Sequence, residues 1–490
     1  MKKIKYAIVI SIILMAILTT ASPVFSSELD FSIIDNYIEQ EMRFSRIPGL
    51  SLGIVKNGEI VYLQGYGRTG DKQQVTPQTP FVIGSNSKSF TALAAMQLVE
   101  EGRLELDKPV RSYLPWFSMS GEFDSSEITI RHLLVQTSGI SNAAGNTRIL
   151  EDDSNTLEEE IRELENVSLV HRPGKAYIYS NVNYDILGLI IDTISNQGYV
   201  DHVRTRILSP LDMQNSFLTR EDGEKAGLTP GHIKVFGFPV SPELQYLKNS
   251  LSSGFIISCA EDMSRYLVMH LGNGLYEGNT IISEEGLETI YQPGATESGD
   301  SEYAMGLIVR SDDNSRLIMH DGGTQGFNSG MVFSPEEQWG VVVLTNMTSM
   351  FEMPAMSIAL GVTEIVRGNE TPALNRIQGI SYLVVLVIIL VLLTLIIRSM
   401  IRLPKRWRKI ISENRPAGFK QILRKVILPV ILELIIPFII FIFIPVNAGF
   451  PVWRLLALMN PDIVYGLLIL SSLLMIKALW RIYLAIRISG

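Results

Sequence analysis

The chain has 490 residues, of which 47% are hydrophobic and 19% charged, and its formal net charge at pH 7 is −8. The charge is unevenly distributed, because residues 27–370 carry 24 Lys and Arg against 47 Asp and Glu, a net charge of −23. This acidity argues against nucleic acid as a partner, since binding a polyanion depends on Lys and Arg.

Residues 1–26 are predicted to be a secretory signal peptide. Three lysines within the first five residues precede an apolar run at residues 6–18, and small residues follow that run. The sequence Val24-Phe25-Ser26 favours cleavage before Ser27, and an uncleaved anchor is the alternative. Residues 27–370 would then form an exported domain.

Residues 47–67 predict a β-hairpin, with Asn57-Gly58 as the turn between two apolar runs. A second pair of strands is predicted at residues 302–310 and 331–346, and the latter has a turn of its own. Helical segments lie between these strands. The order indicates an α+β fold, in which an antiparallel sheet is flanked by helices and accompanied by an all-helical subdomain.

Ser85 and Lys88 lie in the sequence GSNSKSFT. Residues 90–100 contain no Pro or Gly and predict a helix that ends near Gly102, so Ser85 lies at its N-terminus. The i, i+3 spacing puts both side chains on one face, where the amine can act as a base for the hydroxyl. Backbone N–H groups at a helix start also stabilise a developing negative charge. A capping serine is the alternative, although Lys88 is the only lysine with a serine three residues before it.

Two further residues are interpreted as structural. Cys259 is the only cysteine, so the chain can form no intrachain disulfide and offers no cysteine cluster for a metal. We expect it to be a small buried apolar residue, and we expect neither a metal nor a cofactor. His270 is at the end of an apolar segment that predicts a helix. We therefore expect His270 to be structural as well.

Residues 371–490 are predicted to be a membrane domain, with three transmembrane helices at about 379–397, 426–446 and 463–484. The loop between the first two spans has ten Lys and Arg against one acid, which predicts a cytoplasmic position. The next loop has a single base and is predicted outside. The protein is therefore expected to be a multi-pass protein of the cell membrane, with residues 27–370 extracytoplasmic.

The second span contains Glu433 between Pro429 and Pro437. An ionisable group inside a membrane is costly, and contact with a substrate or partner is the functional hypothesis for it. The alternative is a protonated or interior-facing carboxyl that stabilises helix packing.

Five sequence blocks in residues 34–347 resemble the serine β-lactamase and penicillin-binding protein superfamily, in its branch of class C β-lactamases, DD-peptidases, D-aminopeptidases and related esterases. The blocks are GSNSKSFT (84–91), ITIRHLLVQTSGI (128–140), PGKAYIYSNVNYDILGLII (173–191), ILSPLDM (207–213) and IMHDGGTQGFNSGMVFSPEEQWGVVVLTN (318–346). The resemblance implies a β-lactamase/transpeptidase-like fold with Ser85 as the nucleophile and Lys88 beside it.

Within the third block, Tyr179-Ser180-Asn181 looks like the family's Tyr-x-Asn motif. By this resemblance Tyr179 is the proton shuttle, and it acts as a base only where nearby cations such as Lys88 hold it partly ionised. Asn181 would orient Lys88 and bind a substrate amide oxygen. A core aromatic is the alternative for Tyr179.

His320-Asp321-Gly322 resembles the position of the family's Lys-Thr-Gly motif, where His is common in the peptidase and esterase relatives. Gly322 and Gly323 would let a substrate lie against the strand, and by resemblance the N–H groups of Ser85 and Gly323 form the oxyanion hole.

Asp321 would affect which substrates bind, and Gln136 differs from the residue that the family usually has at its position. A site-facing Asp321 would disfavour substrates with a free carboxylate and favour neutral or amine-bearing ones; a solvated carboxylate is the alternative. Gln136 stands where the family pattern usually has His, and we interpret it as a variation that leaves the nucleophile unaffected.

The sequence therefore predicts a membrane-anchored extracytoplasmic serine hydrolase that forms an acyl-enzyme on Ser85 and cleaves a D-amino-acid-containing peptide or an acyl-amide. Its expected partners are that small substrate and membrane lipid. The three C-terminal spans resemble those of colibactin-type prodrug-activating peptidases, whose Tyr-Ala-Ser differs from Tyr179-Ser180-Asn181. The alternatives are a cell-wall DD-peptidase or β-lactamase, and a non-catalytic ligand sensor.

Overall fold

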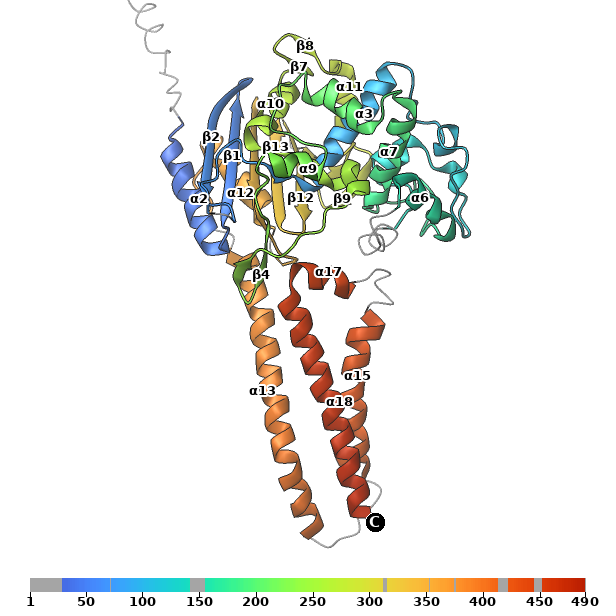
Figure 1. Cartoon of the computed structure of the whole chain (residues 1–490), viewed down its shortest axis with the longest axis vertical. Helices are drawn as coiled ribbons and strands as arrows, with labels where there is room; N and C mark the ends of the chain where they lie inside the picture. Colours follow the sequence, from blue (N-terminus) through green and yellow to red (C-terminus); the bar gives the residue numbers. More distant parts are fainter. Residues whose placement is uncertain are drawn as a thin grey trace, which may run out of the picture.

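A computed structural model describes residues 29–70, 72–141, 155–311, 315–351, 353–373, 376–412, 422–444 and 452–489. The signal peptide predicted at residues 1–26 lies outside these residues. Figure 1 shows a mixed α and β part at one end of the molecule and long helices that extend away from it.

An eight-stranded antiparallel sheet forms the centre of the mixed α and β part. The order of its strands is β2-β1-β14-β13-β12-β11-β10-β9. Its strands are β1 (Gly49–Lys56), β2 (Glu59–Gly67), β9 (Ala295–Ser298), β10 (Ser301–Tyr303), β11 (Ile308–Ser311), β12 (Arg316–Thr324), β13 (Phe327–Ser334) and β14 (Trp339–Thr345). The predicted hairpin is β1–β2, and Asn57 and Gly58 adopt the positive φ angles of 53° and 76° that its turn requires.

The prediction of one strand at residues 302–310 is wrong, because the chain turns back there to form β10 and β11. Gly306 lies in the turn with a φ of 72°, and a Cβ on it would lie 2.7 Å from the Lys88 carbonyl oxygen. Close packing against the helix that carries Lys88 thus breaks the strand at a position only glycine fills easily.

Helices cover both faces of the sheet. On β14, Val341 and Val343 belong to the core under α2 (Phe31–Ser45) and α12 (Pro354–Val366). Val342 belongs to the core of the opposite face, where α10 (Ala260–Leu271) packs. Successive side chains of a strand point to opposite faces, so a strand covered on both sides is apolar throughout.

The helical subdomain lies between the N-terminal and C-terminal strands of the sheet in sequence and beside the sheet in space (Figure 1). Its main helices are α4 (Ile130–Leu134), α6 (Leu157–Arg162), α7 (Asn181–Ile194) and α8 (Tyr199–Val203), and α3 (Ser87–Glu100) packs against α7 and α8. The predicted α+β class, with an antiparallel sheet, flanking helices and a helical subdomain, is confirmed.

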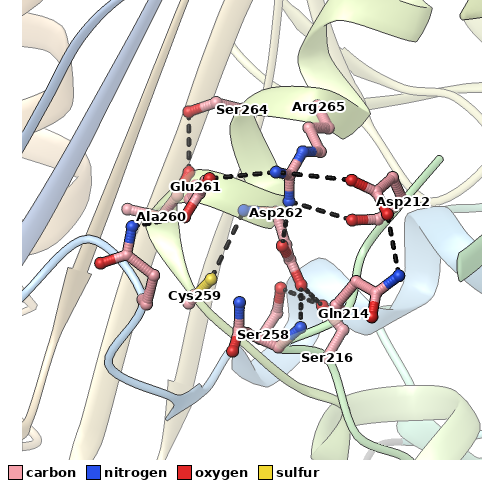
Figure 2. Close-up of polar contacts among 12 residues, drawn as sticks. Asp212, Gln214, Ser216, Ser258, Cys259, Ala260, Glu261, Asp262, Ser264 and Arg265 are labelled. Carbon is pink, nitrogen blue, oxygen red and sulfur yellow. Dashed lines mark hydrogen bonds and ion pairs between the residues drawn. The ribbon is translucent and has the colours of Figure 1, made fainter.

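A buried polar network fixes the N-terminus of α10, as Figure 2 shows. The Asp262 carboxylate accepts hydrogen bonds from the backbone of Asn215 at 2.7 Å, from the Ser216 hydroxyl at 2.8 Å and from Arg265 at 2.8 Å. The Cys259 sulfur caps the helix by accepting from the Asp262 N–H, and burial raises the pKa of its thiol. Cys259 is fully buried, as expected, and its setting is structural.

His270 lies at the other end of α10. It is buried, and its Nδ1 lies 2.6 Å from the hydroxyl of Tyr291. Burial lowers the pKa of the imidazole to about 3, so the ring is neutral. The structural interpretation of His270 fits this buried position at a helix end.

Three helices are long and apolar enough to cross a membrane: Ile380–Lys405, Leu423–Phe443 and Pro461–Ile486. The first lies within α13 (Arg376–Ser412), the second contains α15 (Leu428–Phe438), and the third lies within α18 (Pro461–Ser489). A short helix, α17 (Val452–Met459), lies across the top of these helices, beneath the mixed α and β part (Figure 1). The three predicted spans thus correspond to three helices, although α13 continues past the predicted end at Ile397.

Glu433 faces the third span rather than lipid. Its Oε1 lies 3.0 Å from the Lys477 amine and 2.8 Å from the Arg481 guanidinium. The carboxylate is only 6% exposed, so removing it would leave two cations without their partner. This geometry favours the interpretation of Glu433 as a group that stabilises helix packing.

Candidate active site

Ser85 lies in a 3-10 turn, Gly84–Asn86, directly before α3. The turn is held by the Ser87 hydroxyl, which donates to the Gly84 carbonyl at 2.7 Å, and by the Ser329 hydroxyl, which donates to the Ile83 carbonyl at 2.6 Å. Asn86 in turn donates to Ser329 at 2.7 Å. The nucleophile is therefore tied to β13 of the sheet and cannot shift without breaking these bonds.

The three residues predicted to be catalytic lie together with Asn181, which was predicted to orient Lys88. The Lys88 amine is 3.2 Å from the Ser85 Oγ and donates to the Asn181 Oδ1 at 2.7 Å. The Tyr179 hydroxyl donates to the Ser85 Oγ at 2.7 Å. The serine hydroxyl is thus within hydrogen-bond distance of both groups that could move its proton.

Burial lowers the pKa of the Lys88 amine to about 7, while the charges of Asp185 and Asp321 act in the opposite direction. The side chain is fully buried, and its third acceptor is the Ser253 carbonyl at 2.5 Å. A lysine with this pKa is neutral in a large fraction of molecules at pH 7, so it can accept a proton from Ser85.

Burial raises the pKa of the Tyr179 phenol, and Asp321 raises it further. The expectation that Lys88 holds this phenol partly ionised is therefore not supported, although the Lys88 Nζ lies 4.9 Å from the centre of its ring. The pKa directions thus favour Lys88 over Tyr179 as the group that accepts a proton, and favour Tyr179 as a protonated phenol.

Gln136 holds the segment that carries Tyr179. Its Oε1 accepts hydrogen bonds from the Ser180 N–H at 3.0 Å and from the Asn183 amide at 2.5 Å. The side chain is fully buried and has no hydrogen bond to Ser85. Its presence in place of the family's His thus affects how Tyr179 is positioned and leaves the nucleophile's own contacts intact.

His320 lies on β12, where its Nε2 is 3.2 Å from the Tyr303 hydroxyl and its Nδ1 is 2.5 Å from the Asp321 carbonyl. Burial lowers the pKa of the imidazole, so the ring is neutral at pH 7. The rings of His320 and Tyr179 are 6.4 Å apart. His320 therefore lines the tyrosine side of the site and has no hydrogen bond to the nucleophile.

Asp321 is partly exposed, and its charge reaches the catalytic groups, since it raises the pKa of both Lys88 and Tyr179. A second carboxylate, Glu297 on β9, also raises the pKa of Tyr179, and burial and the charge of Asp321 raise the pKa of Glu297. The edge of the site near Tyr179 is therefore acidic.

The backbone of β12 runs directly against the nucleophile turn. A Cβ on Gly84 would lie 2.5 Å from the Gly323 nitrogen, and one on Gly322 would lie 2.1 Å from the Ile83 carbonyl oxygen. This close approach brings the Gly323 amide beside the Ser85 turn, as the predicted oxyanion hole requires.

Two residues of the site escaped the sequence analysis. Asp185 lies one helical turn after Asn181 on α7, is buried and acts electrostatically on Lys88. Its i+4 spacing from Asn181 could have indicated this position, because residues four apart lie on the same face of a helix. Ser253 takes part through its backbone carbonyl, which the residue type cannot reveal.

A cavity with a volume of about 230 Å³ opens beside Ser85. Ser85, Asn181 and Gly323 line it together with Met353 and, from the membrane domain, Leu458. A larger hollow of about 1490 Å³ lies elsewhere, around α2 and α12, and is lined by none of the catalytic residues.

Comparison with known proteins identifies the family that the sequence blocks resemble. The beta-lactamase family model matches residues 34–360. The protein Flp of Staphylococcus aureus (strain MW2) is 31% identical over 65% of this chain, and the match spans 63% of Flp, less than two thirds of its length. PbpX of Bacillus subtilis (strain 168) is 30% identical over 64% of this chain and 73% of its own.

The octameric penicillin-binding protein homologue from Pyrococcus abyssi has a similar solved structure, with a TM-score of 0.59 and 29% identity over 69% of this chain and 78% of its own. Fold, motif geometry and sequence similarity agree over the same region. The chain belongs to the beta-lactamase family of serine hydrolases.

Proposed function

We propose that the protein is a membrane-anchored serine hydrolase that works through an acyl-enzyme on Ser85. The observation that carries this proposal is the position of the Ser85 Oγ, 3.2 Å from a lysine amine and 2.7 Å from a tyrosine hydroxyl. An intact proton-transfer set of this kind serves bond cleavage and is unnecessary for a ligand sensor.

In the first half of the reaction, neutral Lys88 takes the hydroxyl proton as the Ser85 Oγ bonds to the carbonyl carbon. The electron pair of the carbonyl moves to its oxygen, which accepts hydrogen bonds from the N–H groups of Ser85 and Gly323. Collapse of this intermediate breaks the bond to the leaving group, which takes a proton from Tyr179. The proton on Lys88 then restores the phenol.

In the second half, a water molecule attacks the ester carbonyl of the acyl-enzyme and gives a proton to Lys88. The bond between the carbonyl carbon and the Ser85 Oγ breaks, the acid leaves, and the Ser85 oxygen takes the proton from Lys88, which becomes neutral again. Lys88 acts as a base in both halves, so one group with a pKa near neutrality serves the whole cycle.

The substrate proposed is an acyl-amide or a peptide that contains a D-amino acid, including the cap of a nonribosomal peptide prodrug. The acidic edge formed by Asp321 and Glu297 favours a neutral or amine-bearing substrate over one with a free carboxylate. A cell-wall DD-peptidase or β-lactamase is the second candidate, and the similarity to a penicillin-binding protein homologue favours it.

The orientation proposed is a catalytic domain outside the cytoplasm. The loop between the first two spans has ten Lys and Arg against one acid, and basic loops of this kind stay in the cytoplasm. A basic start followed by an apolar run at residues 1–26 supports the same orientation.

Hydrolysis of a panel of substrates by the full-length protein tests the proposal. The panel contains N-acyl-D-aminoacyl amides with and without a free carboxylate on the leaving side, and labelled penicillin is assayed beside it. We expect turnover of the neutral amides that Ser85→Ala abolishes. Rapid penicillin labelling with no amide turnover would support the DD-peptidase or β-lactamase candidate instead.

A further inference from the structure

The cavity beside Ser85 is built from both parts of the protein. The catalytic domain contributes Ser85, Asn181 and Gly323, and the C-terminal end of α17 contributes Leu458 and Met459. Met350 and Met353, in the segment that precedes α12, add further apolar surface to the lining. A segment between two of the candidate membrane spans thus lines the same cavity as Ser85.

Buried polar contacts fix the α17–α18 turn to the catalytic domain. The Asn460 Oδ1 accepts a hydrogen bond from the Met350 N–H at 2.9 Å, and the side chain of Asn460 is fully buried. Asp462 accepts from the Phe236 N–H at 2.8 Å and from the hydroxyl of Tyr382 on α13. A buried polar group is costly unless it is paired, so these pairings favour one fixed arrangement of the two parts.

A second link joins the C-terminal end of α17 to the residue that follows β12, the strand that carries Gly323. The side chain of Gln325 donates to the Leu458 carbonyl at 3.0 Å, and Gln325 follows Gly323 by only two residues. The position of Leu458 is therefore coupled through one side chain to the backbone that would hold the substrate's carbonyl oxygen.

The proposed reaction places the cavity on the acyl side of the scissile bond. Asn181 and Gly323 line it, whereas Tyr179 and His320 do not. Since Tyr179 donates the proton that the leaving group needs, the leaving group lies toward Tyr179 and the acyl group toward the cavity.

We propose that the membrane domain completes the acyl-binding pocket of this enzyme, and that Leu458 and Met459, with Met350 and Met353, form an apolar wall for a hydrocarbon acyl chain. This inference rests on the proposed function. The pocket, at about 230 Å³, is smaller than the roughly 300–1,000 Å³ of sites that enclose a drug-sized ligand, so it holds one part of the substrate. Unbranched methionine side chains adapt readily to a flexible chain.

The placement of the wall suits a substrate that is itself amphiphilic. Met459 is two residues before Pro461, where the third span begins, and α17 lies between the catalytic part and the long helices (Figure 1). An acyl chain in the pocket is therefore next to the surface that continues into the membrane. A wholly polar acyl group would leave this wall without a partner.

The test is a chain-length series with the full-length protein in nanodiscs. We measure kcat/KM for p-nitrophenyl acetate, butanoate, hexanoate and octanoate below their micelle concentrations, so that only the acyl group changes. A buried methylene contributes about fourfold at most, and we expect kcat/KM to rise by two- to fourfold per methylene until the pocket is full. Leu458→Asn should flatten this dependence.

A filling variant and a matched control complete the test. Met459→Phe should shorten the longest chain that is accepted, an effect that a poorly folded variant cannot imitate. Leu275→Asn changes a leucine that is 49% exposed and outside the pocket, and it should keep the wild-type chain-length dependence.

The outcomes separate the two proposals. A dependence that is flat in the wild type, or unchanged by both Leu458→Asn and Met459→Phe, would overturn the acyl wall while leaving the hydrolase intact. No acylation of Ser85 by any ester in the series would overturn the proposed function itself.

Discussion

The amine of Lys88 lies 3.2 Å from the hydroxyl of Ser85, inside a site whose burial lowers the lysine pKa to about 7. The pair places an amine that is partly deprotonated near pH 7 beside a hydroxyl at the start of a helix.

The rate of acylation should rise with pH through about pH 7 and then level off. Below this pH Lys88 is protonated and cannot accept the Ser85 proton; above it the amine is neutral. The measurement is kcat/KM for p-nitrophenyl acetate between pH 5 and 9, compared with Lys88→Met, which should retain little activity. A flat profile in the wild type across this range would contradict the role of Lys88.

Replacing Asp185 by Asn should move the midpoint of this profile to lower pH. The Asp185 charge raises the pKa of Lys88, so removing it lets burial lower that pKa further. Glu297→Gln is the matched control, because the charge of Glu297 acts on Tyr179, whereas Asp185 and Asp321 are the charges that act on Lys88. A midpoint that stays in place, in a variant with an unchanged thermal unfolding transition, would show that Asp185 does not act on the lysine.

Tyr179→Phe should reduce turnover by roughly 10²- to 10⁴-fold, the usual contribution of a positioned proton donor. The substitution removes one hydroxyl, which donates to the Ser85 Oγ at 2.7 Å, and keeps the ring that packs near Lys88. Esters with a good leaving group need this proton least, so the loss should be larger for amides than for p-nitrophenyl esters. An equal loss for both classes would argue that Tyr179 only positions Ser85.

Asp321→Asn should increase the rate at which substrates with a free carboxylate acylate the enzyme. The charge of Asp321 reaches Lys88 and Tyr179, and a like charge on the substrate is repelled there. We would measure the second-order rate of labelling with penicillin and with a neutral ester. The ratio of the two rates should rise several-fold at low ionic strength; an unchanged ratio would indicate that the carboxylate points away from the bound substrate.

Glu433→Gln should destabilise the membrane helices without changing the chemistry at Ser85. The carboxylate is buried between Lys477 and Arg481, and the loss of one member of such a cluster typically costs about 3–5 kcal/mol. Thermal unfolding in detergent and ester hydrolysis are measured on the same preparation. Unchanged stability with lost hydrolysis would instead favour a functional role for Glu433.

The parts of the site that the sequence analysis could predict are local or carry a distinctive motif. Ser85 and Lys88 are one helical turn apart, so their proximity follows from helix geometry alone. Tyr179, Asn181 and Gly323 come from distant segments, and only the resemblance to a known family linked them to Ser85. The turn at Asn57-Gly58, like the spacing of Ser85 and Lys88, could be predicted from local sequence alone.

The parts that could not be predicted depend on tertiary packing. The break between β10 and β11 arises because Gly306 meets the Lys88 carbonyl, a contact between segments more than two hundred residues apart. The pKa values of Lys88 and Tyr179 depend on burial in the folded protein. Burial raises the pKa of the Tyr179 phenol, whereas a partly ionised phenol was expected. The approach of Leu458 to the cavity depends on how the membrane domain packs against the catalytic domain.

The most direct test of the account is the mass of the intact protein after brief incubation with an activated acyl ester, followed by peptide mapping. The account predicts a transient adduct with the mass of one acyl group, located on the peptide that contains Ser85 and absent in Ser85→Ala. An adduct that persists in Ser85→Ala, or ester turnover that continues at the wild-type rate in that variant, would contradict it.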